Sequence, residues 1–253
     1  MRGLALLLVL MATGASAQEA CTQGDGTILR QVCYLSDPPP AAPYGHTILG
    51  DTPEWSSLSL DWGPGADEAY SGGARSLVMR LEGGIFEDVA PRIVELGDDP
   101  LPEVLVVNSE AGQGARALIF DVNADGVRVI AGPFIGQQNR WLAPVGVADL
   151  DGDGLAEIAW VDRPHLARVL RIFRVRGAGL VQVAEMDGVT NHRIGEDHIT
   201  GGIRNCEQGP EMVLVTSDWS RIVGVTMRGK ELRRRDLGPF NGAGSVDRAM
   251  RCG

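Results

Sequence analysis

The sequence has little positive charge. Its 23 lysine and arginine residues are outnumbered by 33 aspartate and glutamate residues, and the formal net charge is -10. A protein that binds nucleic acid needs a clustered basic surface to neutralise phosphates, so we expect no nucleic-acid partner. Beyond the N-terminal segment no apolar run approaches the length of a membrane-spanning helix, so we expect no membrane span either.

Catalytic signatures are also missing. The sequence contains no Gly-x-Ser-x-Gly nucleophile elbow, no glycine-rich phosphate loop and no His-Glu-x-x-His zinc helix. His192 and His198, with two acids between them, could be drawn as a metal site, but strand and turn geometry does not oblige them to converge. These absences favour a protein that is not an enzyme, and an enzyme stays open as an alternative.

Residues 1–17 have the pattern of a secretory signal. Arg2 gives the positive start, Leu4–Met11 is apolar, and Ala15-Ser16-Ala17 is a small-residue cleavage site. We expect this segment to be removed and residues 18–253 to form one domain that is periplasmic or secreted.

The four cysteines are Cys21, Cys33, Cys206 and Cys252, and no two of them form a Cys-x-x-Cys motif. An exported chain with an even number of cysteines is expected to form disulfides, here two. The preferred pairing is Cys206 with Cys252 and Cys21 with Cys33. The competing pairing joins Cys33 to Cys252.

A repeat of about 54 residues runs through the chain. Its landmarks are Glu103, Glu157 and Glu211, and each leads into a short apolar run bounded by Gly, Pro or Asp. Such runs read as buried strands. The runs are Val104–Val107, Ile158–Val161 and Met212–Val215.

A repeat of this length that is built from short strands, without an amphipathic helix, predicts an all-β propeller. A β-sandwich explains the strands but not the constant period. We expect about five blades, with four as the alternative. The last repeat is cut off after Ser245–Arg251, so we expect this segment to be a strand that shares a closing blade with Thr27–Leu35, which removes two exposed sheet edges.

One loop carries a metal-binding pattern. Asp149, Asp151, Asp153 and Glu157 occupy loop positions 1, 3, 5 and 9, and the carbonyl of Leu155 can complete the shell. Alternate residues of a tightly curled loop point their oxygens at one centre. Calcium takes six to eight oxygen ligands, whereas zinc prefers His or Cys, so the pattern predicts calcium as the cofactor. Four carboxylates in nine residues would also repel one another without a cation.

The segment Asp149–Ile158, followed by Ala159–Asp162, resembles the calcium loop of FG-GAP/VCBS repeats, which occur in integrin alpha-chain-like propellers and bacterial exported proteins. The resemblance implies a propeller braced by calcium, with function in the loops of one face. The Phe-Gly-x-Gly-Ala-Pro signature of that family is missing. Two related loops are degraded: Glu95–Glu103 gains a proline, and 203–211 lacks the first acid.

Polar and aromatic residues recur where the blades begin, and superposed repeats would gather them around one mouth of the propeller. A polar and aromatic rim of this kind is a usual ligand site, although the same residues can simply bond neighbouring blades together. The candidates are His46, Asn139, Arg140, Trp141, Asn191, His192 and Arg193.

The leading hypothesis for function is an exported calcium-binding module that binds or scaffolds a protein or glycan ligand. The alternatives are an extracellular enzyme that acts on a glycan or polymer at the mouth, and a purely structural envelope protein. Four arginines also crowd one predicted strand, and we expect them to lie on a solvated outer strand paired with acids. They are Arg168, Arg171, Arg174 and Arg176.

Overall fold

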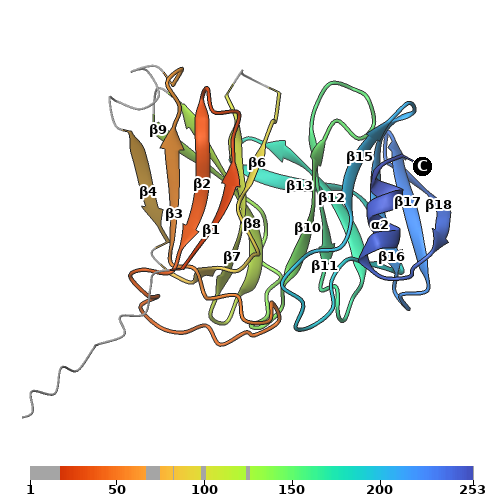
Figure 1. Ribbon diagram of the computed structural model, residues 1–253, viewed down its shortest axis with the longest axis horizontal. Helices are drawn as coiled ribbons and strands as arrows, with labels where there is room; N and C mark the ends of the chain where they lie inside the picture. Colours follow the sequence, from red (N-terminus) through yellow and green to blue (C-terminus); the bar gives the residue numbers. More distant parts are fainter. Residues whose placement is uncertain (1–17, 67–74, 82, 98–100, 124–125, 253) are drawn as a thin grey trace, which may run out of the picture.

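The computed structural model describes residues 18–66, 75–81, 83–97, 101–123 and 126–252. The expected signal segment, residues 1–17, lies outside this part. Strands dominate the described residues and one short helix follows them, so the predicted all-β class is confirmed (Figure 1).

The strands form four antiparallel units, each from one contiguous stretch of chain, which we call units 1 to 4. Unit 1 contains β1 (Glu19–Gln23), β2 (Leu29–Leu35), β3 (Ser57–Trp62) and β4 (Ser76–Arg80). Unit 2 contains β5 (Ile85–Phe86), β6 (Arg92–Val94), β7 (Glu103–Glu110), β8 (Gly114–Asn123) and β9 (Gly126–Ala131). Unit 3 contains β10 (Leu142–Ala148), β11 (Glu157–Asp162), β12 (Val169–Arg176) and β13 (Gly179–Asp187). Unit 4 contains β14 (Val189–Thr190), β15 (Gly202–Cys206), β16 (Gly209–Thr216), β17 (Arg221–Arg228) and β18 (Glu231–Pro239), and helix α2 (Ala243–Met250) follows it.

Successive strands are neighbours within each unit. In units 2 and 4 the first strand is split, because β5 and β6 both pair with β7, and β14 and β15 both pair with β16. A single parallel contact, Gly179 beside Ala131, joins β13 to β9 and links units 2 and 3 into one nine-stranded sheet. The predicted apolar runs are confirmed as strands β7, β11 and β16.

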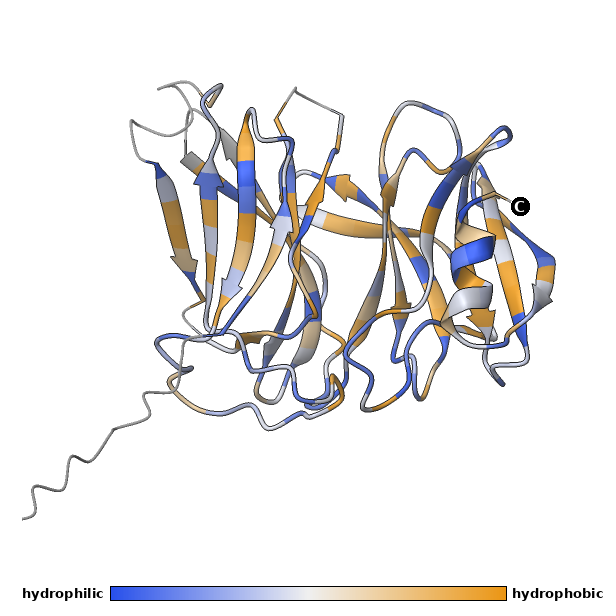
Figure 2. Ribbon diagram, viewed as in Figure 1, coloured by the Kyte–Doolittle hydropathy of each residue, from blue (hydrophilic) through white to orange (hydrophobic). Residues whose placement is uncertain are grey.

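The units pack face to face in chain order, and the alternation of side chains along a strand explains how. On β7, Val104 and Val106 pack toward unit 1, whereas Leu105 and Val107 pack toward unit 3. Strands buried on both faces read as continuous apolar runs, which is the pattern of these segments (Figure 2). The same alternation on β11 sends Ile158 and Trp160 toward unit 2, and it sends Ala159 and Val161 toward unit 4.

The C-terminal segment differs from the prediction. Residues 243–250 form helix α2, which covers the outer face of unit 4 with Val246 and Met250 packed against Val213 and Val215. The strand predicted for Ser245–Arg251 is therefore wrong. Val246, Ala249 and Met250 have the three- and four-residue spacing of one helix face, which favours a helix over a strand here.

The predicted ring closure is also wrong. Strand β2 pairs with β1 and β3, and α2 lies at the opposite end of the molecule, against unit 4 (Figure 1). The face of unit 1 that carries Cys21, Ser59 and Val78 has no sheet packed on it among the described residues, and Val78 is 52% exposed. The closing blade that would make the fifth is absent from the part of the chain described.

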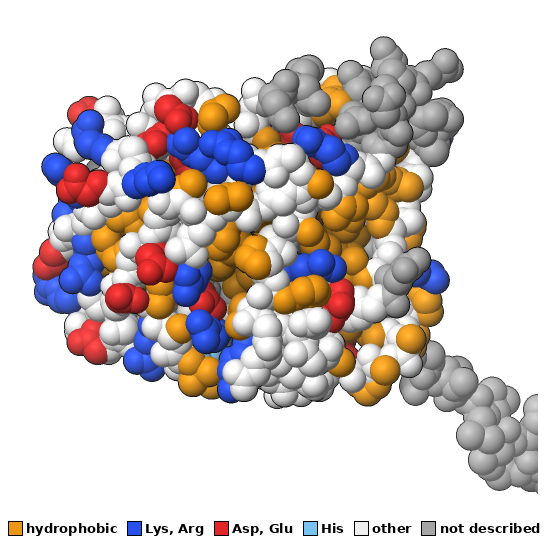
Figure 3. Space-filling view, turned by 180° about the vertical axis from the view of Figure 1, so that it is seen from behind, with side chains coloured by type: hydrophobic (Ala, Val, Ile, Leu, Met, Phe, Trp, Pro, Cys, Tyr) orange, Lys and Arg blue, Asp and Glu red, His pale blue; other side chains and the backbone are white. Residues whose placement is uncertain are grey.

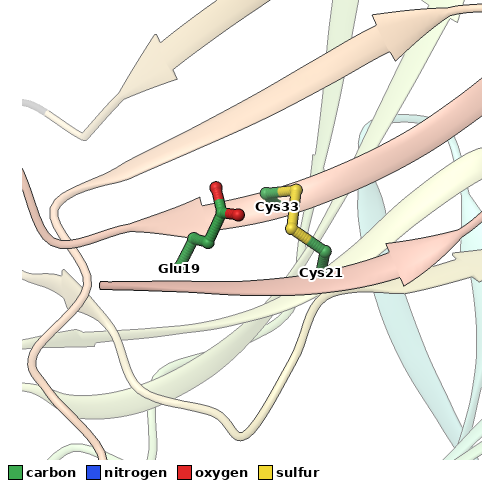
Figure 4. A group of neighbouring side chains, drawn as sticks. All are labelled: Glu19, Cys21 and Cys33. Carbon is green, nitrogen blue, oxygen red and sulfur yellow. A yellow bond between two sulfur atoms is a disulfide. The ribbon is translucent and has the colours of Figure 1, made fainter. Parts of the chain in front are cut away.

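Both disulfides of the preferred pairing are confirmed. Cys21 and Cys33 are direct cross-strand neighbours on β1 and β2, with Glu19 beside them (Figure 4). Cys206 at the end of β15 bonds to Cys252 just after α2. The second bridge forms because α2 packs back onto its own unit. The prediction instead expects loops of two neighbouring blades to bring these cysteines together.

Candidate functional site

The predicted metal loop connects β10 to β11, and its first aspartate organises the turn. Oδ1 of Asp149 accepts hydrogen bonds from the backbone N–H of Gly152 (2.8 Å) and Asp153 (3.0 Å), and Oδ2 accepts one from Gly154 (2.9 Å). Gly152 and Gly154 have φ angles of 81° and 90°, which glycine adopts without strain. The curled loop is therefore held by hydrogen bonds from its backbone to the Asp149 carboxylate.

Three of the predicted ligands converge. Asp149, Asp151 and Asp153 each offer a carboxylate oxygen, and these oxygens lie within 4.8 Å of one another. This donor set fits a hard cation such as calcium. The side chain of Leu155 is exposed, and its N–H donates to Oδ1 of Asp153 (3.0 Å).

Glu157 does not belong to this cluster of three aspartates. It is fully buried, its Oε2 accepts the N–H of Leu150 (2.7 Å), and its Oε1 accepts a hydrogen bond from Nε of Arg174. Burial raises the pKa of this carboxyl, although the hydrogen bonds from Leu150 and Arg174 oppose the rise. In this structure Glu157 acts as a strut between the loop and the sheet.

Arg174 supplies a cation within the protein. It lies directly opposite Glu157 in the β11–β12 hairpin, and its guanidinium also contacts Oδ2 of Asp151 (2.9 Å) and Oδ2 of Asp153 (2.8 Å). Its side chain is only 13% exposed, so the expected solvated position does not hold for this arginine. The repulsion that indicated a metal is thus relieved at least in part by Arg174, a residue that the loop motif does not contain.

The repeated glutamates share the strut role. Glu103, Glu157 and Glu211 are all buried, and each binds a group seven residues earlier. That group is the N–H of Leu96 for Glu103 (2.9 Å) and the N–H of Leu150 for Glu157. For Glu211 it is the guanidinium of Arg204, with Nε at 2.8 Å. The glutamates spaced by 54 residues therefore have a structural role: each links its own strand (β7, β11 or β16) to the segment that precedes it.

The two degraded loops behave differently. Asp99 lies outside the described residues, so the acids of the Glu95–Glu103 loop are not all placed. Residues 203–211 form the tight β15–β16 hairpin instead of an acidic loop. There Glu211 is held by Arg204 and by Arg235, whose Nε lies 2.5 Å from Oε1.

Most of the predicted mouth residues do gather on one face, where the segment 44–54 of unit 1 reaches the other three units. We call this segment the hub loop. Nδ1 of His46 lies 2.6 Å from Oε1 of Glu87 in unit 2. The Tyr44 hydroxyl accepts the N–H of Asn139 at the start of unit 3 (2.9 Å). The carbonyl of Ile48 accepts the N–H of Gly195 in unit 4 (2.8 Å).

Trp141 and His192 lie at the centre of this face and are almost completely buried. Nε1 of Trp141 donates to the carbonyl of Glu87 (2.7 Å), and the indole lies 5.0 Å from the His192 ring. Nε2 of His192 lies 3.0 Å from the carbonyl of Glu196, which can only accept, so Nε2 carries the proton. In neutral His192 the Nδ1 atom is then an acceptor for Nε2–H of His165 (2.9 Å).

The remaining candidates are placed less centrally. Asn191 is buried and donates to the carbonyls of Ala143 (3.2 Å) and Pro144 (3.4 Å). Arg140 donates to the carbonyl of its neighbour Asn139. Arg193 points away from the hub, since its guanidinium lies 4.0 Å from the ring centroid of Trp219.

Burial shifts the pKa of several titratable groups of the hub toward their neutral forms. Burial raises the pKa of Glu87, against the opposing contact with His46. Burial and the neighbouring His192 lower the pKa of His165 to about 4. The hollow beside His46, Trp141 and His165 has a volume of only about 20 Å³. These polar groups are satisfied largely by one another, which is how units are bonded together.

Comparisons with known proteins leave the chain without a family assignment. No protein-family model matches it. No curated protein matches it either. Among the described residues no helix has the length and apolar character needed to cross a membrane.

Proposed function

We propose that this chain is an exported calcium-binding module of the FG-GAP/VCBS type that binds or scaffolds a protein or glycan ligand. Four successive antiparallel units with a 54-residue period support propeller blades, and they favour the count of four. The two disulfides support an oxidising compartment outside the cytoplasm, either the periplasm or the extracellular medium.

The observation that carries this proposal is the hub loop, which hydrogen-bonds to all three other units. These contacts make one rigid face from four separate stretches of chain. A rigid face suits recognition because little conformational entropy is lost on binding. Glu87 and Asp88, beside the hub loop, are buried and already bonded to His46 and Arg92, which favours a structural use over acid–base catalysis.

The calcium part of the proposal rests on Asp149, Asp151 and Asp153, with the Leu155 carbonyl as a further donor. Bound calcium would neutralise the three carboxylates and cross-link the loop. Arg174 forms ion pairs with two of these aspartates, Asp151 and Asp153. We therefore expect calcium binding to require that these two carboxylates break their contacts with the guanidinium. This competition predicts a modest affinity for calcium.

Calcium binding is tested by calorimetric melting of the mature chain in calcium and in chelator. Calcium should raise the melting temperature in a concentration-dependent way, because an ion that binds only the folded state stabilises it by mass action. Asp151→Asn should abolish most of the shift. The matched control is Asp187→Asn, at an exposed aspartate on β13 far along the chain from the loop. Identical melting of the wild type in calcium and chelator would remove calcium from the proposal.

The binding role is tested by screening soluble polysaccharides against the immobilised protein and by following the same polysaccharides for cleavage. Retention of a polysaccharide without products supports the binding module. Release of shorter products would instead support the alternative of an enzyme acting at the hub face. A Trp141→Phe variant keeps an aromatic ring but removes the hydrogen bond to the carbonyl of Glu87. A change in polysaccharide retention by this variant would indicate that the hub face is the binding surface.

A further inference from the structure

A polar hollow of about 430 Å³ lies between α2 and the outer face of unit 4, away from the hub and from the aspartate loop. Its charged lining consists of Arg204 on β15, Arg235 on β18 and Arg248 on α2. Asn241 and Ser245 add polar groups to the same wall. Hollows of this size hold ligands as large as a sugar or a small organic acid.

The charges around the hollow do not balance. Glu211 is the carboxylate that reaches these arginines, with Arg204 on Oε2 and Arg235 on both oxygens. Arg248 is exposed, and no acidic side chain of the described residues pairs with it. Three guanidinium groups thus face one carboxylate, in a protein whose net charge is -10.

The arrangement of these arginines is built into the fold. The side chain of Arg204 is 5% exposed, and it donates to Glu211 and to the carbonyl of Ala249 at the end of α2. Gly224 on β17 leaves the space through which Glu211 reaches Arg235, since a Cβ there would lie 2.2 Å from Oε1. The Cys206–Cys252 disulfide fixes the end of α2 against β15. Arg204 and Arg235 are therefore held in place before any ligand arrives.

We propose that this hollow binds a small oxyanion, an organic acid or acidic sugar that carries carboxylate or sulfate groups. Arg248 supplies an unpaired guanidinium, and Arg235, whose side chain is 59% exposed, supplies N–H groups beyond those on Glu211. Guanidinium groups bind carboxylate and sulfate through paired, charge-assisted hydrogen bonds. The site is separate from the proposed hub face and from the proposed calcium loop.

The test is calorimetric titration of the mature protein with citrate, with D-glucuronate and with inorganic sulfate, at a constant ionic strength set by chloride. At least one of the three should bind at 1:1 stoichiometry. Arg248→Ala should weaken that binding about tenfold or more, as expected for the loss of a hydrogen bond to a charged group. The exposed Arg248 side chain pairs with no acidic side chain among the described residues, so this variant should melt like the wild type.

The matched control is Arg228→Ala, at an exposed arginine on the last residue of β17 that does not line the hollow. It should leave the affinity unchanged. Preference for citrate and glucuronate identifies a carboxylate ligand, and preference for sulfate identifies a sulfated one. Equal weakening by Arg228→Ala and Arg248→Ala, or no binding of any of the three anions, would overturn the proposal.

Discussion

Replacing Glu157 with alanine should destabilise the fold even when no metal ion is present. In the wild type the Glu157 carboxylate binds the N–H of Leu150 and the guanidinium of Arg174. Alanine leaves the Leu150 N–H without its partner, at a cost of about 1–3 kcal/mol. Arg174 keeps Asp151 and Asp153, so its loss is smaller than the roughly 3–5 kcal/mol of a fully broken buried pair.

Together these losses amount to about 3 kcal/mol, which corresponds to a fall in melting temperature of about 6–12 °C for a chain of this size. The measurement is differential scanning calorimetry in chelator, where any contribution from a bound metal is removed. Exchange of the Leu150 amide proton, followed by NMR, should accelerate in parallel. The matched control is Glu185→Ala, which removes a half-exposed carboxylate that pairs with Arg171 and should cost less than about 1 kcal/mol.

The chelator separates the two possible roles of Glu157. A residue that acts only as a metal ligand would leave the melting temperature in chelator unchanged on substitution. If Glu157→Ala and Glu185→Ala melt together in chelator, the strut interpretation of the repeated glutamates is refuted.

Two further predictions concern unit 4 and the hub. Gly224→Ala places a Cβ against Glu211 and should lower the free energy of unfolding, measured in urea, by about 1–3 kcal/mol. Gly244→Ala in α2, where a Cβ meets nothing within 4 Å, should not destabilise the protein. Equal unfolding midpoints for the two variants would contradict this prediction. The pKa of His165 is lowered to about 4, so between pH 6.5 and 4 the unfolded chain binds a proton that the folded chain does not, and stability should fall as the pH drops through this window. His165→Asn should lose less stability than the wild type between pH 7 and pH 5 in urea titrations, and identical losses would show that His165 does not contribute.

The local patterns of the sequence predicted much of the fold. The apolar runs after Glu103, Glu157 and Glu211 are strands because they are short, rich in β-branched residues and buried on both faces. The repeat predicts a strand at Ser245–Arg251, whereas the three- and four-residue spacing of Val246, Ala249 and Met250 indicates the helix α2 that forms there.

The aspartate loop was located from spacing alone, but its electrostatic partner was not. Arg174 follows Glu157 by 17 residues, and only the register of the β11–β12 hairpin brings the two together. The repeat likewise pointed to the hub residues, whereas the burial of Trp141 and the outward turn of Arg193 depend on packing between units. The charged hollow depends on Arg204, Arg235 and Arg248, which come from three separate elements and share no motif.

Helix α2 has a consequence for self-association. It occupies the place that another sheet would take, over an apolar face of unit 4 formed by Val213, Val215 and Ile222. Reduction of the Cys206–Cys252 bridge would free one end of the helix, and lifting the helix would uncover this face. Two molecules opened in this way would each present an apolar sheet face of the kind that joins units within one chain. By covering this apolar face, the helix prevents sheets of different molecules from stacking end to end.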